Sequence, residues 1–184
     1  VLYRSNAQSR AIEEALLRIS IPYRIYGGLR FYERLEIKNA IAYLKIIFNN
    51  NDNPSFERSI SNPTRGVGEK TLGKIRQTAQ KYNISYIKAS AKLIDEGSIS
   101  GRGGSGLRDY LEFVAGCKSF IEDNSLSDLM ELIIKESGLY SYHAKEAGEK
   151  GKTRTENLEE LITATKNFEQ SIKEDKTNTE IAEN

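Results

Sequence analysis

The sequence predicts a mainly α-helical protein in which a helical subdomain is attached to a short strand–helix–strand unit. Apolar residues recur at helical spacing through most of the chain after residue 30. Two short β-prone runs, residues 1–4 and 23–26, flank one amphipathic segment near the start. The run Gly66-Val67-Gly68 stands directly before another helical pattern, which is typical of a helix–hairpin–helix element.

Composition narrows the class of protein. The chain has 184 residues, of which 38% are hydrophobic, enough for one domain of ordinary size. Its single cysteine, Cys117, rules out a disulfide within the chain, and no apolar run approaches the ~18 residues that span a membrane. The net charge is +1, but residues 1–76 hold 13 Lys and Arg against 7 Asp and Glu, whereas residues 77–184 hold 14 against 19. The first part therefore offers a positive field to an anionic partner.

Residues 1–28 are expected to form a strand, a helix and a second strand. Apolar residues at helical spacing mark the helix: Ala11, Ile12, Ala15, Leu16 and Ile19. Pro22 ends this helix, and Gly27-Gly28 closes the unit. A unit of this size is one parallel crossover, which cannot bury both of its faces alone. We therefore expect it to belong to a larger α/β sheet, and we expect the chain, which begins with Val1, to be a piece of a longer protein.

Helical patterns then continue to residue 168. We expect helices at residues 33–48, 55–60, 69–82, 85–93, 107–121, 125–138, 139–147 and 155–168. Five glycines and three serines predict a loop at residues 97–106, and residues 148–154 are expected to form a charged turn. Residues 169–184 are polar and aperiodic, which predicts a disordered tail. No internal repeat is visible in the sequence.

The stretch around Gly66 has the residue types of a phosphate-binding turn. Glycines permit a tight reversal and leave the N–H groups of the turn uncovered. The helix that begins at residue 69 adds unpaired N–H donors and the positive end of its dipole. Thr64, Arg65 and Lys70 can add a hydroxyl and two positive charges, while Val67 can point inward. From these residues alone the alternative is an ordinary turn between helices, because a single Gly-x-Gly is a weak signal.

Four stretches of the chain carry a family resemblance. They are Val1–Arg10 (VLYRSNAQSR), Pro22–Lys38 (PYRIYGGLRFYERLEIK), Asn62–Gly68 (NPTRGVG) and Gly148–Leu161 (GEKGKTRTENLEEL). In order and spacing, from residue 1 to about 168, they resemble the UvrD/Rep/PcrA-type superfamily 1A DNA helicases, and most of all the UvrD branch. Val67 stands where the family usually has isoleucine, which keeps an apolar residue inside the turn.

The resemblance implies a domain organisation. Residues 1–28 would be a fragment of the RecA-like lobe 2A, residues 29–168 the helical subdomain 2B, and residues 169–184 a polar tail. The parent would be an ATP-dependent 3′–5′ DNA helicase of DNA repair or replication. It would work in the bacterial cytoplasm, at the nucleoid, with DNA, the remaining helicase lobes and DNA-repair proteins as partners.

The chain itself lacks the residues for the parent's chemistry. It has no Gly-x-x-x-x-Gly-Lys-Ser/Thr motif to hold a triphosphate, and Asp95-Glu96, at a predicted helix end, is better explained as a solvated cap than as a Mg²⁺ site. We therefore expect neither a cofactor nor a metal in this chain, with ATP and Mg²⁺ bound elsewhere in the parent. Without these groups the chain should be inactive as an enzyme by itself.

The resemblance also implies a function for the hairpin. Subdomain 2B would bind the backbone of duplex DNA without sequence preference and would regulate unwinding by swivelling. Six residues form the predicted duplex-phosphate set: Thr64, Arg65, Gly66, Val67, Gly68 and Lys70. Arg4 and Asn6 would contact single-stranded DNA in the parent, although a turn cap is the alternative for Asn6. A different class of function stays open, namely a protein-interaction or autoinhibitory module with negligible DNA affinity, which would use residues 97–106 and the acidic second half.

Other polar residues have competing interpretations. Arg24, Arg30, Arg34 and Lys38 can line DNA, but ion pairs with Glu33 and Glu36 are the preferred explanation. A second basic turn consists of Lys150, Lys152 and Arg154. Contact with DNA and neutralisation by the neighbouring glutamates are equally good explanations for it. His143 has no partners at metal-ligand or catalytic spacing, which predicts a surface or helix-end position.

Overall fold

The computed structural model describes the backbone of residues 6–23 and 31–182, and the side-chain surroundings of residues 11–23 and 31–173. All regular elements in these ranges are helical, which confirms the mainly α prediction. They are α1 (Asn6–Arg18), the short 3₁₀ helix η1 (Phe31–Glu33), α2 (Leu35–Phe48), α3 (Asn53–Ser61), α4 (Glu69–Tyr82), α5 (Tyr86–Asp95), α6 (Gly101–Asp123), α7 (Leu126–Glu136), α8 (Leu139–Ala144) and α9 (Glu149–Ala182). The two predicted strands lie outside the described residues, except that Tyr23 is in no regular element.

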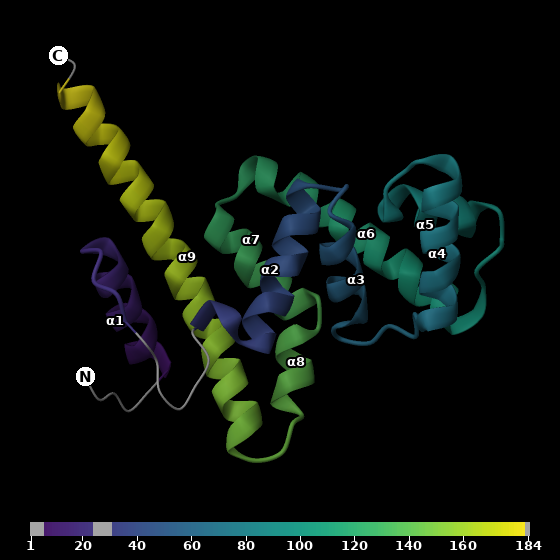
Figure 1. Ribbon diagram of the computed structural model, residues 1–184, viewed down its shortest axis with the longest axis horizontal. Helices are drawn as coiled ribbons and strands as arrows, with labels where there is room; N and C mark the ends of the chain where they lie inside the picture. Colours follow the sequence, from purple (N-terminus) through teal and green to yellow (C-terminus); the bar gives the residue numbers. More distant parts are fainter. Residues whose placement is uncertain (1–5, 24–30, 183–184) are drawn as a thin grey trace.

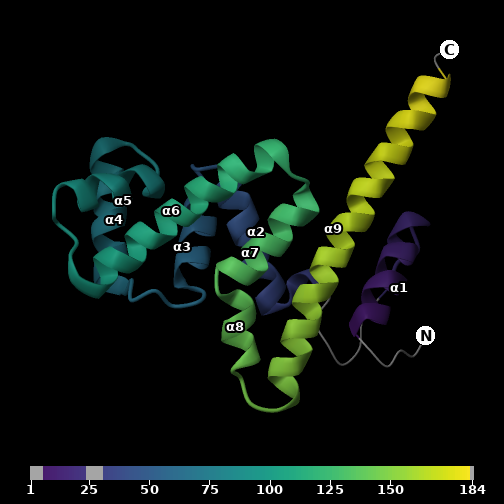
Figure 2. The ribbon, with the colours of Figure 1, turned by 180° about the vertical axis from the view of Figure 1, so that it is seen from behind.

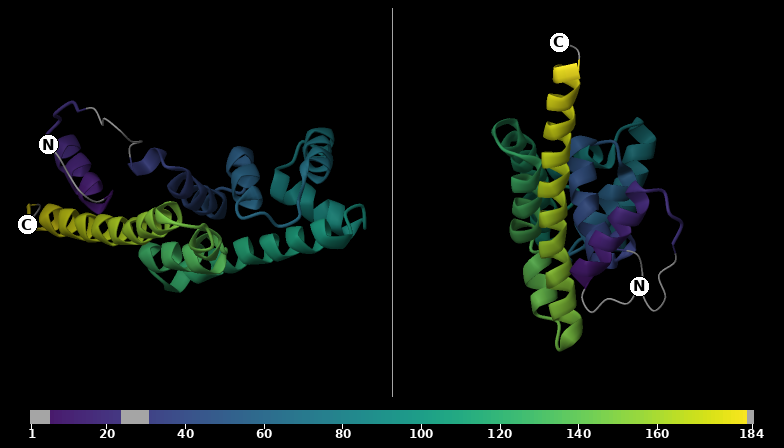
Figure 3. Two further views of the ribbon diagram at one scale, coloured as in Figure 1. Left: turned by 90° about the horizontal axis from the view of Figure 1, so that it is seen from below. Right: turned by 90° about the vertical axis from the view of Figure 1, so that its left-hand side faces the viewer.

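The helices form two layers along an elongated molecule. Figure 3 shows α1 to α5 on one side and α6 to α9 on the other. In Figure 1, α4 and α5 lie at one end, and α6 connects them to a central group made by α2, α3, α7 and α8. Figure 2 shows α1 beside α9 at the opposite end. In chain order, α3 packs mainly on α2 and α4 mainly on α5, so the segment between α3 and α4 joins two helix pairs.

The centre of the core is an aromatic cluster shared by α2, α3 and α6. Tyr43, Phe56 and Tyr110 are fully buried. The rings of Phe56 and Tyr110 meet edge to face at 5.5 Å, and those of Tyr43 and Tyr110 lie 6.1 Å apart. The Tyr43 hydroxyl lies 2.7 Å from the carbonyl oxygen of Ser59, while the Tyr110 hydroxyl lies 2.6 Å from Ser59 Oγ. Burial raises the pKa of both phenols, so they stay neutral and are available as hydrogen-bond donors.

Local capping explains where several helices begin and end. Ser85 accepts a hydrogen bond from the Lys88 N–H at the start of α5, and Ser125 forms a reciprocal capping box with Asp128 at the start of α7. Asn83 ends α4 in the left-handed conformation. The predicted helix at residues 69–82 is therefore confirmed.

The prediction of a loop at residues 97–106 is wrong in its second half. Helix α6 begins at Gly101, and three more glycines of the predicted loop, Gly103, Gly104 and Gly106, lie in its first two turns. These glycines lower the intrinsic helix propensity by about 1 kcal/mol each. Tertiary packing outweighs that cost. A Cβ on Gly103 would lie 3.1 Å from the carbonyl oxygen of Gly66, and one on Gly106 would overlap the carbonyl oxygen of Arg65. The glycines thus serve close packing within a helix rather than loop flexibility.

The last helix is longer at both ends than the sequence pattern predicts. Helix α9 begins at Glu149, within the predicted charged turn, and continues to Ala182 through the predicted disordered tail. Residues 152–184 contain neither glycine nor proline, so the backbone meets no helix breaker there. Among the residues whose side chains are described, α9 contributes Leu158 and Leu161 to the buried core, and Ile162 packs against it. The pattern therefore marks the packed length rather than the helical length.

Candidate nucleic-acid interface

The predicted hairpin lies between α3 and α4. Gly66 has a φ of +74°, which only glycine adopts without strain, and Gly68 is the N-cap of α4. The first intrahelical bonds run from the N–H groups of Thr71 and Leu72 to the Gly68 carbonyl, so the N–H groups before Thr71 have no acceptor within the helix. Val67 is half-buried against the core, as predicted. The start of α4 thus has backbone N–H groups without an acceptor in the helix, next to a turn at Gly66.

Four of the six predicted phosphate-binding residues are exposed. They are Thr64, Gly66, Gly68 and Lys70. Lys70 makes no hydrogen bond or ion pair within the part of the chain that the structure describes. The neighbouring acid, Glu69, is paired with Arg76, which also binds Glu57 through two nitrogens at 2.6 and 2.8 Å. The carboxylate nearest the hairpin is therefore already engaged and does not compete for Lys70.

Arg65 differs from the prediction of a mobile phosphate ligand. Its Nη2 donates to the carbonyl oxygen of Ser137 at 2.7 Å, and its Nη1 donates to the carbonyls of Pro63 at 2.9 Å and Ser59 at 3.2 Å. The guanidinium also stacks near the rings of Tyr43 and Tyr110, 5.4 and 5.5 Å from their centroids. Arg65 therefore fastens the hairpin to the core and to the end of α7.

Helix α6 lies against the hairpin backbone. A Cβ on Gly106 would overlap the carbonyl oxygen of Arg65, and one on Gly103 would lie 3.1 Å from the carbonyl oxygen of Gly66. Only glycine permits this approach. Gly103 and Gly106 belong to the glycine-rich run at residues 97–106. The glycine content of this run predicted a loop, whereas the three-residue spacing of these two glycines suits one face of a helix.

A cationic groove between α2 and α3 was missed from the sequence. Its volume is about 410 Å³, and its basic residues are Lys38, Lys45 and Arg58. Asp52, the N-cap of α3, is the carboxylate of the groove. The hydrogen bond from the Ser55 N–H holds the pKa of Asp52 below its usual range. Lys38 and Lys45 are seven residues apart on one helix, a spacing that could have indicated a shared face.

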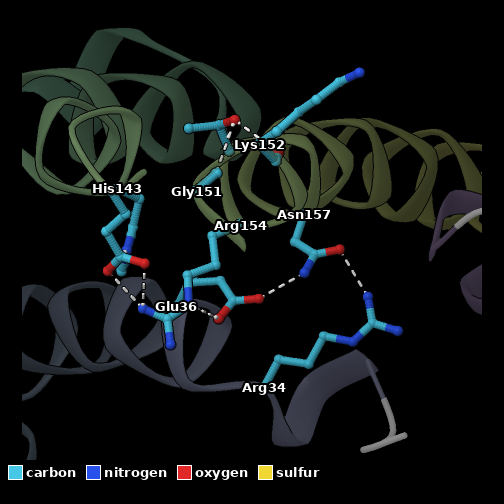
Figure 4. A network of polar contacts seen from close by, with 9 residues as sticks. Arg34, Glu36, His143, Gly151, Lys152, Arg154 and Asn157 are labelled. Atoms are coloured by element: carbon cyan, nitrogen blue, oxygen red, sulfur yellow. Dashed lines mark hydrogen bonds and ion pairs between the residues drawn. The ribbon is translucent and has the colours of Figure 1, made fainter. Parts of the chain in front are cut away.

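A polar network connects the start of α2 with the start of α9 (Figure 4). Asn157 is at its centre: its side chain accepts from Arg34 at 2.7 Å and donates to the buried carboxylate of Glu36 at 2.6 Å. Arg154 lies 3.7 Å from Glu36 and donates to both carboxylate oxygens of Glu146 at 2.6 and 2.9 Å. Arg34 thus has a structural role, but it binds the Asn157 amide in place of the predicted ion-pair partners Glu33 and Glu36. Arg154 is also structural.

His143 is buried, at the C-terminal end of α8, so the helix-end prediction holds and the surface prediction does not. Its Nδ1 lies 3.1 Å from Glu146. Gly151 makes this junction possible, because a Cβ there would lie 2.8 Å from the carbonyl oxygen of His143. Lys150 and Lys152, the rest of the second basic turn, are exposed.

The predicted single-strand contacts cannot be placed in the same way. Arg4 lies outside the described residues, and Asn6 is described only as the first residue of α1. Their role remains a prediction. Within the described residues, no group of three or more His, Cys, Asp or Glu side chains could hold a metal ion. None of the described helices is long and apolar enough to cross a membrane.

Comparison with known proteins assigns the family. Residues 1–100 match the family described as the UvrD-like helicase C-terminal domain. The chain belongs to this UvrD-like helicase family. It is 48% identical to DNA helicase II of Escherichia coli strain K12 over 168 residues, which are 91% of this chain and 23% of that protein.

Other relatives agree with this assignment. DNA helicase II of Haemophilus influenzae is 47% identical over 91% of the chain, which corresponds to 23% of its own length. The ATP-dependent DNA helicase PcrA of Bacillus subtilis is 36% identical over 96% of the chain, or 24% of its own length. The chain of this UvrD-like protein thus spans about a quarter of each curated relative that it matches.

Proposed function

We propose that this chain is the part of an ATP-dependent 3′–5′ DNA helicase that binds the backbone of duplex DNA through the hairpin at residues 62–70. The observation that carries the proposal is the exposed glycine turn directly before α4, with Lys70 beside it, in a chain whose relatives are named DNA helicases. Backbone N–H groups and a lysine recognise phosphate, which is common to all sequences, so binding would not depend on base sequence.

Each exposed residue of the hairpin has a distinct part in this proposal. The N–H groups around Gly66 and Gly68 would donate hydrogen bonds to a phosphate oxygen at the positive end of α4, and the Thr64 hydroxyl would add a neutral hydrogen bond. Lys70 would supply charge. Val67 would hold the turn on the core, and Arg65 would position it from inside. Because each neutralised phosphate contributes about −0.9 to the slope of log affinity against log salt, binding should weaken steeply with salt.

The parent's ATP and Mg²⁺ would be bound by helicase lobes outside this chain, because the residues of a triphosphate site are not in its sequence. The unit at residues 1–28 would pack on the rest of lobe 2A. Leu17, Ile19 and Ile21 support this, since their side chains are 61%, 62% and 48% exposed and would gain from a covering surface. We further propose that the helical subdomain swivels about this unit during unwinding, in a bacterial cytoplasmic enzyme that meets DNA and DNA-repair proteins.

Fluorescence anisotropy tests the duplex proposal. The chain would be titrated into a labelled duplex with a 3′ single-stranded tail at several salt concentrations. Gly68→Ala is the most informative variant because a Cβ at Gly68 meets nothing within 4 Å and its φ of −95° suits alanine, so the fold should persist while the N–H groups are covered. Gly73→Ala, on the same helix and equally open, is the matched control.

We expect salt-sensitive binding that Gly68→Ala and Lys70→Ala weaken, whereas Gly73→Ala and Lys88→Ala, a change at an exposed lysine of α5, bind like the wild type. A folded wild-type chain that does not bind DNA at the lowest salt would contradict the proposal. That result would favour the protein-interaction or autoinhibitory alternative. The contact surface would then be the acidic second half of the chain. Residues 101–106, predicted as part of a loop on that surface, would contribute as the start of helix α6.

A further inference from the structure

Arg102 lies on the hairpin although it is 36 residues away from Gly66 in the sequence. It is exposed, in the first turn of α6. If Gly66 carried a Cβ, that atom would lie 2.9 Å from Arg102 Cγ, 3.3 Å from Cδ and 3.4 Å from Nε. The stem of Arg102 therefore runs across the backbone of Gly66. The φ of +74° favours glycine at this position, and a side chain there would displace the stem of Arg102.

The backbone of α6, rather than a bond to the arginine head, fixes Arg102 in this place. The close approach of Gly103 and Gly106 to the hairpin carbonyls sets the position of the helix start. Within the described residues, the guanidinium of Arg102 has neither a hydrogen-bond acceptor nor an ion-pair partner. A positive charge in the first turn of a helix is also unfavourable for the helix itself. Arg102 thus contributes little to stability through its charge, and its five donors remain available.

The two arginines at the hairpin have opposite surroundings. Arg65 uses both of its terminal nitrogens on backbone carbonyls inside the molecule. Arg102 lies outside, over the same turn, with its donors unused. A guanidinium presents a planar fork that matches two phosphate oxygens, so a phosphate seated on the turn could be bound by backbone N–H groups and by Arg102 together.

The segments that precede α4 and α6 are also alike, a repeat that was not recognised in the sequence. The N-caps Gly68 and Ser100 are both extended, with ψ of 179° and −179°. The apolar residues directly before them, Val67 and Ile99, both point into the core. Lys70 is the second residue of α4, and Arg102 is the second residue of α6. Lys70 and Arg102 therefore occupy equivalent positions, each at the start of its helix and close to the turn at Gly66.

We infer that Arg102 is a DNA-phosphate-binding residue of the hairpin and takes the role that the sequence predicted for Arg65. This inference rests on the proposed function, since it concerns the same duplex backbone. It adds a residue from a different helix to the site. The ligand is the phosphodiester group of duplex DNA, bound by one guanidinium and the backbone of the turn.

The test compares Arg102→Ala with Arg108→Ala, which removes an exposed arginine one and a half turns further along α6. Binding to the tailed duplex is measured by anisotropy across a salt series, and thermal unfolding is measured for every variant. We expect Arg102→Ala to weaken binding about tenfold at low salt. We expect it to reduce the magnitude of the salt slope by about 0.9. Its melting temperature should equal or exceed that of the wild type, and Arg108→Ala should bind like the wild type.

Arg102→Lys separates charge from geometry. It should retain the salt slope and lose part of the affinity, because an ammonium cannot form the two-pronged contact. If Arg102→Ala binds like Arg108→Ala while Lys70→Ala is weakened, the inference is overturned and the proposed function stands. If the folded wild-type chain binds no DNA, both fail. A drop in melting temperature of Arg102→Ala that accounts for its lost binding would also overturn the inference, because it would show a structural role.

Discussion

Gly106→Ala is the most direct probe of how α6 lies on the hairpin. A Cβ at this position would overlap the carbonyl oxygen of Arg65 and would lie 3.0 Å from its carbonyl carbon. Both are backbone atoms, held by the internal bonds of Arg65, so they cannot rotate aside as a side chain would. To accept the methyl group, α6 and the hairpin must move apart.

The magnitude follows from two opposing terms. Replacing glycine by alanine inside a helix stabilises it by about 1 kcal/mol. Overpacking a close contact costs about 1–3 kcal/mol, and the upper figure applies where backbone must shift. The net expectation is a loss of about 2 kcal/mol, which lowers the melting temperature of a chain of this size by about 4–8 °C.

Gly116→Ala supplies the matched control on the same helix. Nothing lies within 4 Å of a Cβ at Gly116, so only the propensity term acts. We expect a gain of about 1 kcal/mol and a rise of about 2–4 °C. Thermal unfolding followed by circular dichroism measures both variants, and the anisotropy assay should show weakened DNA binding for Gly106→Ala alone. A Gly106→Ala chain as stable as Gly116→Ala would refute the close packing of α6 on the hairpin.

Two further variants test the interior of the site and the cap of α3. Arg65→Lys should lower the free energy of unfolding by about 2 kcal/mol. Charged hydrogen bonds contribute about 1.5–3 kcal/mol, and an ammonium group cannot both reach the same carbonyls and stack on the rings. A variant whose urea unfolding matches that of the wild type would contradict this. Asp52→Ala should cost about 1 kcal/mol at neutral pH by removing the N-cap. Since the folded-state pKa of Asp52 is lowered, the charge-dependent part of that cost is fully present above the unfolded-state pKa and is lost as pH falls through the folded-state value. Asp52→Asn, which keeps a cap without a charge, should show no such pH dependence in unfolding measured by urea.

Local chemistry made much of the helical framework predictable. Helix α4 was placed at its observed bounds because Gly68 precedes it and Asn83 follows it, and both signals act within a few residues. The starts of α5 and α7 were likewise visible as Ser85 and Ser125. The inward position of Val67 followed from one apolar residue between two glycines. The ends of α9 were not predictable in this way, because hydrophobic periodicity records packing in the core, whereas the helix runs from Glu149 to Ala182.

The roles of the charged residues needed the tertiary structure. Arg65 and Arg102 both stand near glycines in the sequence, and nothing local distinguishes them. Arg65 is internal because Tyr43, Tyr110 and the Ser137 carbonyl, all distant in sequence, converge on it. The same applies to Arg154, whose partner Glu36 is contributed by another helix.

The sequence by itself therefore determined the helical class, most helix boundaries and the glycine turn, since each depends on propensity, capping or backbone freedom over a few residues. Only the tertiary structure decided that the glycines of α6 are helical and press on the hairpin, that Arg65 is internal and that Arg102 lies exposed over Gly66. The physical reason is that these outcomes depend on which atoms from distant parts of the chain come within a few ångströms of one another, and close packing can outweigh a local preference of about 1 kcal/mol.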